Sequence, residues 1–97
     1  MTRPITNGPA RTSPDGTHPH THDLKIGPNY FDAVSDGRKK FELRRNDRDF
    51  KAGDRLMLRE WVASEYTGRC LCCKVDYILS GHDGLDPDYV ILGITVL

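Results

Sequence analysis

Short runs of alternating or β-branched apolar residues fill this chain from residue 40 to its last residue. Glycine, proline, asparagine or aspartate bound each run, and these residues are typical of tight turns. Alternation with a period of two places successive side chains on opposite faces of a strand. The pattern therefore predicts short strands at residues 40–44, 55–61 and 71–79, followed by a nearly continuous β-branched end at 89–92 and 94–97 that only Gly93 interrupts.

The segment before these runs predicts one more strand and one short helix. Residues 23–26 alternate like the later strands, and Pro28 is suited to the first turn of a helix. Apolar residues at 30, 31, 33 and 34 have the spacing of one helical face, and Gly37 is suited to end the helix. We therefore expect an α+β fold of about five to six strands with one short helix after the first strand.

Strands this short, with one polar face, favour a small β-barrel over an open sheet, because closure removes exposed strand edges. In the strand at 40–44 we expect Phe41 and Leu43 to point into the core and Glu42 to point to the other face. Residues 62–68 are expected to form a loop. Gly93 is expected to mark a bulge or a close backbone approach.

The hydrophobic residues that a core needs are scarce at the beginning of the chain. Residues 1–22 contain only Met1, Ile5 and Ala10 as apolar residues and hold four of the six prolines. Such a segment buries too little surface to offset the entropy of ordering, so we expect a disordered Pro/Thr/His-rich arm at 1–22 and one domain at 23–97. Without an apolar run near ~18 residues or an apolar leader, we expect a cytoplasmic protein without membrane contact.

The charges are balanced in total but separated along the chain. There are 14 basic and 14 acidic side chains. Residues 37–59 hold nine basic and four acidic side chains, whereas residues 76–97 hold four acidic and no basic ones. The balance argues against strong, indiscriminate binding along a phosphate backbone. The basic centre still permits a small cleft that recognises one base or nucleotide.

The basic centre begins with Gly37–Arg44, which has the pattern G-x-K-x-x-E-x-R. Glu42 lies between Lys39 and Arg44, which would keep it ionised and let it hold the arginine in position. Lysine offers phosphate a compact charge, and arginine offers phosphate or guanine a planar fork. We expect these three side chains at a binding cleft, with more polar contacts from Arg45, Asn46 and Arg48. The alternative is an ordinary ion pair of Glu42 with Arg44 or Arg59.

Aromatic residues near the expected loop suggest contacts to a base. Trp61 and Tyr66 would stack on an exposed base, with polar contacts from Thr67 and Arg69. The alternatives are that Trp61 belongs to the core, which we favour in a domain this small, and that Tyr66 pins a turn.

Cys70, Cys72 and Cys73 lack the spacing of a zinc site, and a strand would point Cys73 away from the other two. A metal would also need a fourth ligand such as His82. We therefore expect free thiols, no metal and no cofactor. The H-x-H-x-H run at His18, His20 and His22 is interpreted as incidental.

Several segments of the chain, in this order, resemble the phage and bacterial family called domain of unknown function 3850: His22–Ile26, Tyr30–Val34, Phe41–Phe50, Leu58–Trp61 and Val90–Ile94. The G-x-K-x-x-E-x-R pattern also resembles the signature of ASCH domains in the PUA-like superfamily. That resemblance implies a PUA-like (ASCH-type) β-barrel with a cleft beside the helix. It also implies RNA or a nucleotide as the partner.

Three functions follow as hypotheses. The first is a monomeric module that binds RNA, single-stranded nucleic acid or a nucleotide. The second, implied by one ASCH branch, is an amidohydrolase acting on an acylated pyrimidine nucleoside such as N4-acetylcytidine. Lys39 and Glu42 would then be catalytic with Glu60 or Glu65, although that branch has threonine where this chain has Glu42. The third is a phage accessory protein that binds another protein through the acidic segment 83–88.

Overall fold

The computed structural model describes residues 19–97, so most of the predicted arm lies outside the described residues. This part forms five strands and one helix in the order β1 (Thr21–Ile26), α1 (Pro28–Ser35), β2 (Phe41–Arg45), β3 (Arg55–Val62), β4 (Glu65–Leu79) and β5 (Tyr89–Val96). Because β1 begins at Thr21, the folded domain starts earlier than predicted. No helix within residues 19–97 is long and apolar enough to cross a membrane.

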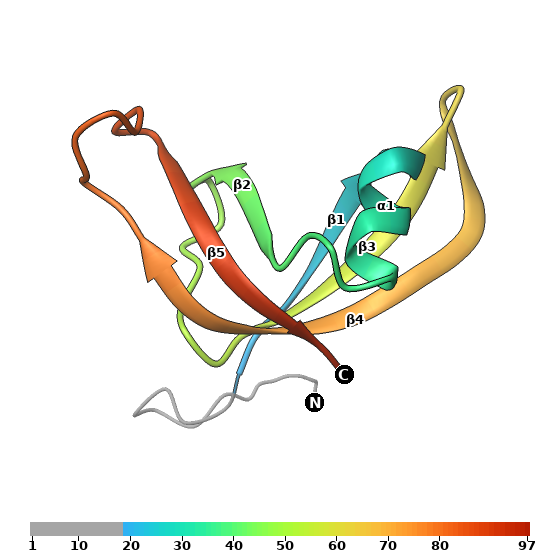
Figure 1. The fold of residues 1–97 in the computed structure, drawn as a ribbon, viewed down its shortest axis with the longest axis horizontal. Helices are drawn as coiled ribbons and strands as arrows, with labels where there is room; N and C mark the ends of the chain where they lie inside the picture. The colour runs from blue at the N-terminus through green and yellow to red at the C-terminus, as the bar shows by residue number, and fades with distance from the viewer. Residues whose placement is uncertain (1–18) are drawn as a thin grey trace.

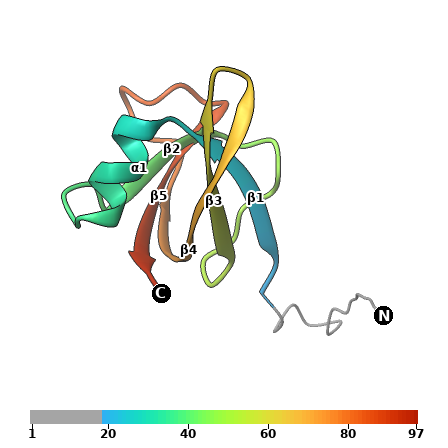
Figure 2. The same ribbon diagram turned by 90° about the vertical axis from the view of Figure 1, so that its right-hand side faces the viewer.

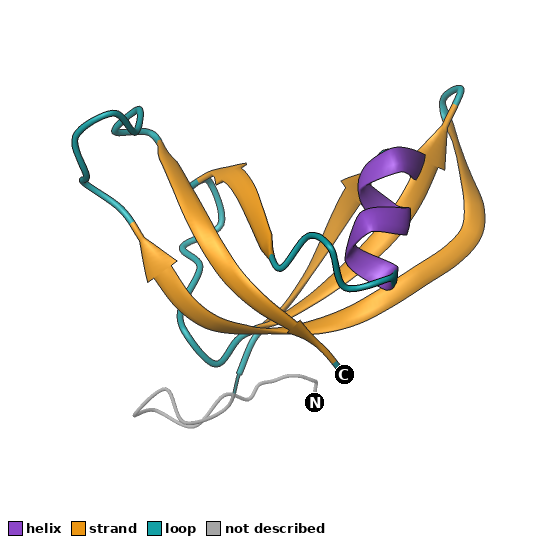
Figure 3. Ribbon diagram, in the orientation of Figure 1, coloured by secondary structure: helices purple, strands orange, loops and turns teal. Residues whose placement is uncertain are grey.

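All five strands form one curled sheet in the order β1-β3-β4-β5-β2 (Figures 1 and 3). β1 is parallel to β3, and the other neighbours are antiparallel. The long strand β4 pairs with β3 along its first part and with β5 along its last part. The domain is a small α+β half-barrel with one short helix after the first strand. The strand number and helix position agree with the prediction, but the sheet does not close by strand pairing.

Side chains bridge the open edges of the half-barrel. Arg44 Nη2 donates to the main-chain oxygen of Lys25 over 2.8 Å, and Arg48 Nη1 donates to that of Asp23 over 2.6 Å. These bonds join β2 and the loop after it to β1. Two unpaired carbonyls of an edge strand are thereby satisfied, which limits further pairing along that edge.

The prediction of a loop at 62–68 is wrong, because β3 ends at Val62 and β4 begins at Glu65, so that these residues form the turn end of a hairpin. Ala63 and Ser64 have positive φ angles of 51° and 68°, as in the two-residue turns that join twisted antiparallel strands. Gly68, with φ +97°, lies in a bulge of β4 where the register between β3 and β4 shifts. A glycine inside a strand has the sequence signature of a loop, which explains the error.

The predicted orientation of β2 is also wrong. Glu42 is only 3% exposed, whereas Phe41 and Leu43 are 47% and 53% exposed. Alternation predicted the correct period, but it could not identify the inner face of a strand at an open edge. A carboxylate can occupy that inner face when neighbouring cations compensate its charge.

The nearly continuous β-branched end of the chain forms one strand, β5, which runs through Gly93. The register shift lies on β4 between Val75 and Tyr77, and Gly93 pairs with Tyr77 beside it. The glycine therefore marks an irregularity in the neighbouring strand and not a break in its own.

The core fills the concave side of the sheet. Its most deeply buried residues come from α1 and the three long strands: Val34, Leu56, Leu58, Cys73, Val75 and Leu92. α1 lies inside the curve of the sheet and packs on β3 (Figures 1 and 2). Gly37 follows the helix with φ +87°, a conformation that glycine adopts without strain, which confirms its predicted role at the helix end.

Candidate functional site

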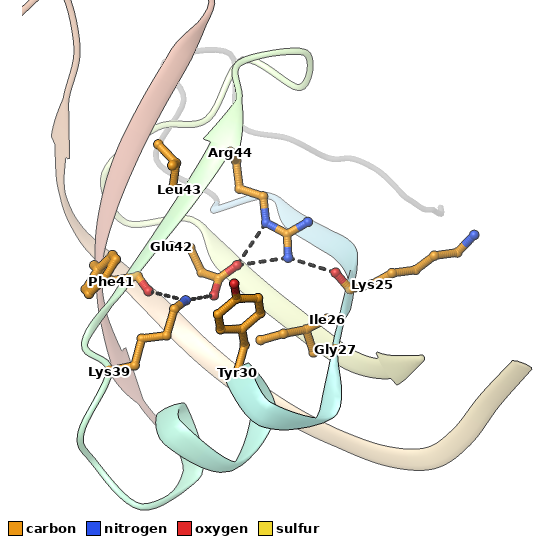
Figure 4. Close-up of a pocket in the computed structure, with 9 residues that line it drawn as sticks. All are labelled: Lys25, Ile26, Gly27, Tyr30, Lys39, Phe41, Glu42, Leu43 and Arg44. Carbon is orange, nitrogen blue, oxygen red and sulfur yellow. Dashed lines mark hydrogen bonds and ion pairs between the residues drawn. The ribbon is translucent and has the colours of Figure 1, made fainter. Parts of the chain in front are cut away.

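A pocket of about 540 Å³ opens between β1, α1 and β2, at the unpaired edge of the half-barrel (Figure 4). The chain leaves β1, forms α1 and returns into β2, so these three elements surround the pocket although β1 and β2 do not pair. Its lining residues are Lys25, Ile26, Gly27, Tyr30, Lys39, Phe41, Glu42, Leu43 and Arg44. The pocket therefore contains the three charged residues of the G-x-K-x-x-E-x-R pattern, Lys39, Glu42 and Arg44.

Glu42 is the centre of an ion network in this pocket. Its Oε1 accepts a hydrogen bond from Lys39 Nζ, and its Oε2 accepts one of 2.9 Å from Arg44 Nε. Lys39 Nζ also donates to the main-chain oxygen of Phe41 over 2.8 Å. The Glu42 side chain is 4% exposed, and those of Lys39 and Arg44 are 16% and 24% exposed. The buried carboxylate thus holds both cations at the pocket, as the sequence predicted for Arg44.

Two aromatic rings stand beside the Lys39 ammonium group. Lys39 Nζ is 5.4 Å from the ring centroid of Tyr30 and 4.9 Å from that of Phe41. Tyr30 is 62% exposed, so solvent reaches the rings from outside. Sequence reasoning missed both residues because it placed them on apolar faces that point to the core. Phe41 lies between Lys39 and Glu42 in the sequence, and this position in the motif could have indicated that it lies at the pocket.

The remaining predicted residues of β2 and its loop do not line this pocket. Arg45 and Asn46 border a shallow hollow with Asp88 at the other end of β2. The Arg45 guanidinium is 3.7 Å from Asp88 and 5.0 Å from the ring centroid of Tyr89. Arg48 contacts β1 as described above. The structure therefore separates these three residues from Lys39, Glu42 and Arg44.

Trp61 and Tyr66 lie on the β3–β4 hairpin, away from the pocket lining. Their ring centroids are 4.8 Å apart with an edge-to-face angle of 76°. Trp61 is half-buried and lies outside the core cluster, so its assignment to the core is wrong. Tyr66 is 54% exposed. The two rings form a partly exposed pair on the hairpin.

Thr67 and Arg69 contact a protein carboxylate. The bulge at Gly68 points both side chains toward the buried Glu60 of β3. Thr67 Oγ1 donates to Glu60 Oε1 over 2.7 Å, and Arg69 donates to both carboxylate oxygens over 2.9 and 2.7 Å. Arg69 also donates to Asp32 of α1 over 2.9 Å. Arg69 therefore ties the hairpin to the helix.

Hydrogen bonds from Arg69 and Thr67 lower the pKa of Glu60 from 4.5 to about 2. A carboxyl group with a lowered pKa in the folded state stabilises that state above its unfolded pKa, and the contribution is lost as pH falls. We expect stability to fall between pH 4.5 and pH 2 more steeply in the wild type than in Glu60→Gln, as measured by urea unfolding. Glu65→Gln, an exposed change on the same hairpin, is the control and should keep the wild-type slope. Equal slopes for wild type and Glu60→Gln would contradict this assignment.

The three cysteines are free thiols. Cys73 is buried and faces the core, whereas Cys70 is exposed and Cys72 is half-buried, which confirms the predicted division between two faces. Burial raises the pKa of Cys73 to about 11, so this thiol stays protonated at neutral pH. Residues 19–97 contain no group of three His, Cys, Asp or Glu side chains arranged to hold a metal.

By its fold and its pocket, the protein is a small α+β half-barrel with an ion-paired pocket at the open edge of its sheet. The chain belongs to the family described as domain of unknown function (DUF3850), whose family model matches residues 21–94. It is 39% identical over 71 residues to an uncharacterized 12.9 kDa protein encoded in the GpA 3′ region of Escherichia phage P2. That alignment covers 73% of this chain and 64% of the phage protein, so the chain spans less than two thirds of this relative.

Proposed function

We propose that this domain binds a nucleotide, or an unpaired base of a single-stranded nucleic acid, in the pocket between β1, α1 and β2. The observation that carries the proposal is that Lys39, Glu42 and Arg44 converge there beside the exposed rings of Tyr30 and Phe41. Pockets for small ligands have volumes of about 300–1,000 Å³ and combine apolar walls with few polar groups. A pocket of about 540 Å³ lies within this range.

The pocket offers a base both stacking and hydrogen bonding. A ring placed against Tyr30 or Phe41 would gain ~1–3 kcal/mol from stacking. Arg44 Nη1 makes no hydrogen bond to any residue of 19–97, so it remains available to a phosphate or to a base oxygen (Figure 4). Glu42 keeps the Arg44 guanidinium in place through Nε. The ligand thus receives one positioned donor group and one aromatic wall.

The same proposal assigns the domain to the PUA-like superfamily. The ASCH-like pattern at Gly37–Arg44 supports this assignment, together with a curled five-stranded sheet and a pocket beside its short helix. A monomeric, RNA- or nucleotide-binding module agrees with the small size of the domain.

The contacts favour binding over amide hydrolysis. Lys39 already donates to Glu42 and to a main-chain oxygen, so its ammonium serves as a donor. Because Arg69 and Thr67 hold the pKa of Glu60 at about 2, this carboxylate is a weak base near neutral pH. Glu65 is exposed at the start of β4. None of these groups is poised to activate water.

Fluorescence anisotropy with short labelled RNAs at two salt concentrations tests the proposal. We expect Tyr30→Ala to weaken binding roughly 10-fold because it removes a stacking wall. Lys39→Ala should also weaken binding and should flatten its salt dependence. Tyr77→Ala removes a tyrosine that is 65% exposed and lies outside the pocket lining, so it should bind like the wild type. Undetectable binding at low salt, or equal affinity for wild type and Tyr30→Ala, would overturn the proposal.

A further inference from the structure

A second aromatic and basic surface lies outside the pocket, on the outer face of β1, β3 and β4. Lys25 Nζ is 4.0 Å from the ring centroid of Trp61, which in turn contacts Tyr66. Lys25 forms no ion pair with another residue of 19–97, so its charge is not neutralised by a described carboxylate. Tyr66 is the more exposed ring of the pair. We refer to Lys25, Trp61 and Tyr66 as the hairpin platform.

Cations continue from the hairpin platform along the outer face. The strand register places Arg59 beside Lys25, and Arg55 beside Lys74 further along the sheet. These residues alternate with buried Leu56, Leu58 and Glu60, so they point to the outer face. Arg59 is 3.6 Å from Asp23, and Lys74 is 3.6 Å from Asp76; both pairs are solvent-exposed and therefore weak. This face can thus attract phosphate groups.

The other half of the outer face has a different character. There, β2, β5 and β4 align Phe41 with Gly93 and Tyr77, and Leu43 with Ile91 and Leu79. These side chains are apolar or aromatic and carry no charge. Arg45 also lies over a ring, that of Tyr89, on this half, but Arg45 is ion-paired with Asp88. Among residues 19–97, a cation that lies over an aromatic ring without a carboxylate partner is therefore found only on the hairpin side of the sheet.

Lys25 connects the pocket to the hairpin platform. Its main chain borders the pocket and accepts the hydrogen bond of Arg44, while its side chain points away from the pocket (Figure 4). The ammonium group at the end of that side chain lies over Trp61. A ligand that leaves the pocket across β1 therefore meets first the unpaired Lys25 ammonium group and then the rings of Trp61 and Tyr66.

We infer that the ligand is a single-stranded oligonucleotide and not a free nucleotide. One base occupies the pocket, a neighbouring phosphate contacts Lys25, and a further base stacks on Tyr66. A free nucleotide fills the pocket but leaves the hairpin platform unused. This inference rests on the proposed function, because the pocket supplies the first of the two contact points. Sequence-tolerant binding is expected at the platform, since every base has a ring face for stacking.

The test compares the affinity of labelled U8 and A8 RNA octamers with that of uridine and adenosine 5′-monophosphates. Octamers are measured by fluorescence anisotropy and monophosphates by calorimetry. We expect the octamers to bind more tightly.

The variants test the hairpin platform itself. Tyr66→Ala should weaken octamer binding roughly 5- to 150-fold and leave monophosphate binding unchanged. Lys25→Gln should lower the slope of log affinity against log salt for the octamer by about 0.7. Tyr77→Ala is the matched control with an exposed tyrosine on the other half of the outer face.

The outcomes separate the inference from the proposed function. Equal affinity for octamer and monophosphate, or an octamer affinity unaffected by Tyr66→Ala, would overturn the inference and leave the pocket proposal standing. Octamer binding that depends on Tyr66 but not on Tyr30 would support the hairpin platform and overturn the pocket proposal. Binding of neither probe would overturn both. Thermal melts of each variant establish that it is folded, and Tyr66 is exposed enough to be replaced without loss of core contacts.

Discussion

We expect Glu42→Gln to lower the free energy of unfolding by about 3 kcal/mol, the lower end of the range for breaking a buried ion pair. The substitution keeps the shape of the side chain but removes the charge that compensates Lys39 and Arg44. The lower end applies because the Lys39 and Arg44 side chains are 16% and 24% exposed, so that water can partly solvate their uncompensated charges. A domain of this size has a total stability of roughly 4–12 kcal/mol, so the loss is severe.

Urea unfolding measures this effect, with an unchanged slope confirming that the transition is the same. Glu65→Gln makes the same chemical change at an exposed position and should cost less than about 0.5 kcal/mol. In the Lys39→Met background, Glu42→Gln should cost at least about 1 kcal/mol less, because one of the uncompensated cations is then absent. A loss below about 1 kcal/mol for Glu42→Gln alone, or strictly additive effects, would show that the network contributes little.

We expect Asp54→Ala to lower the free energy of unfolding by about 3 kcal/mol, because each hydrogen bond to a charged group contributes about 1.5–3 kcal/mol. Asp54 is 2% exposed and lies directly before β3. Its carboxylate accepts hydrogen bonds from the main-chain N–H groups of His20 and Lys51, over 3.2 and 3.0 Å. His22 Nε2 lies 2.7 Å from the same carboxylate. Without this carboxylate, the part-buried groups lose their hydrogen-bond partner.

The effect of Asp54→Ala should be concentrated at β1, an edge strand whose first residues depend on this carboxylate. Hydrogen exchange of the β1 amides should accelerate more than that of the β4 amides. Asp47→Ala removes an exposed carboxylate from the preceding loop and should leave both stability and exchange near the wild type. Uniform acceleration across the sheet, or wild-type stability in Asp54→Ala, would contradict this role.

The local patterns predicted most of the secondary structure. The position of α1, its end at Gly37 and the number of strands all follow from spacing, proline and glycine. The errors occur where a local signal had more than one meaning. Gly68 indicated a loop but occupies a bulge, and the alternation around Glu42 fitted either orientation of the strand.

The candidate site was predicted only in part, for the same reason. The sequence predicted that Lys39, Glu42 and Arg44 lie together, because Glu42 and Arg44 are two positions apart on one strand and Lys39 lies shortly before that strand. It also grouped Trp61, Tyr66, Thr67 and Arg69 with them because of their proximity along the chain. The structure assigns Arg69 and Thr67 to Glu60, and Trp61 and Tyr66 to the hairpin platform. Tyr30 enters the pocket through the packing of α1.

The sequence by itself determined the elements, their order and the charged cluster of the G-x-K-x-x-E-x-R segment, because these depend on residues a few positions apart. Only the tertiary structure decided which face of β2 is buried and that the sheet stays open between β1 and β2. It alone divided the aromatic residues between a pocket and an outer surface. These features depend on contacts between residues far apart in the chain, as in the bond from Arg44 to Lys25, and on the cost of burying Glu42, which its cations offset.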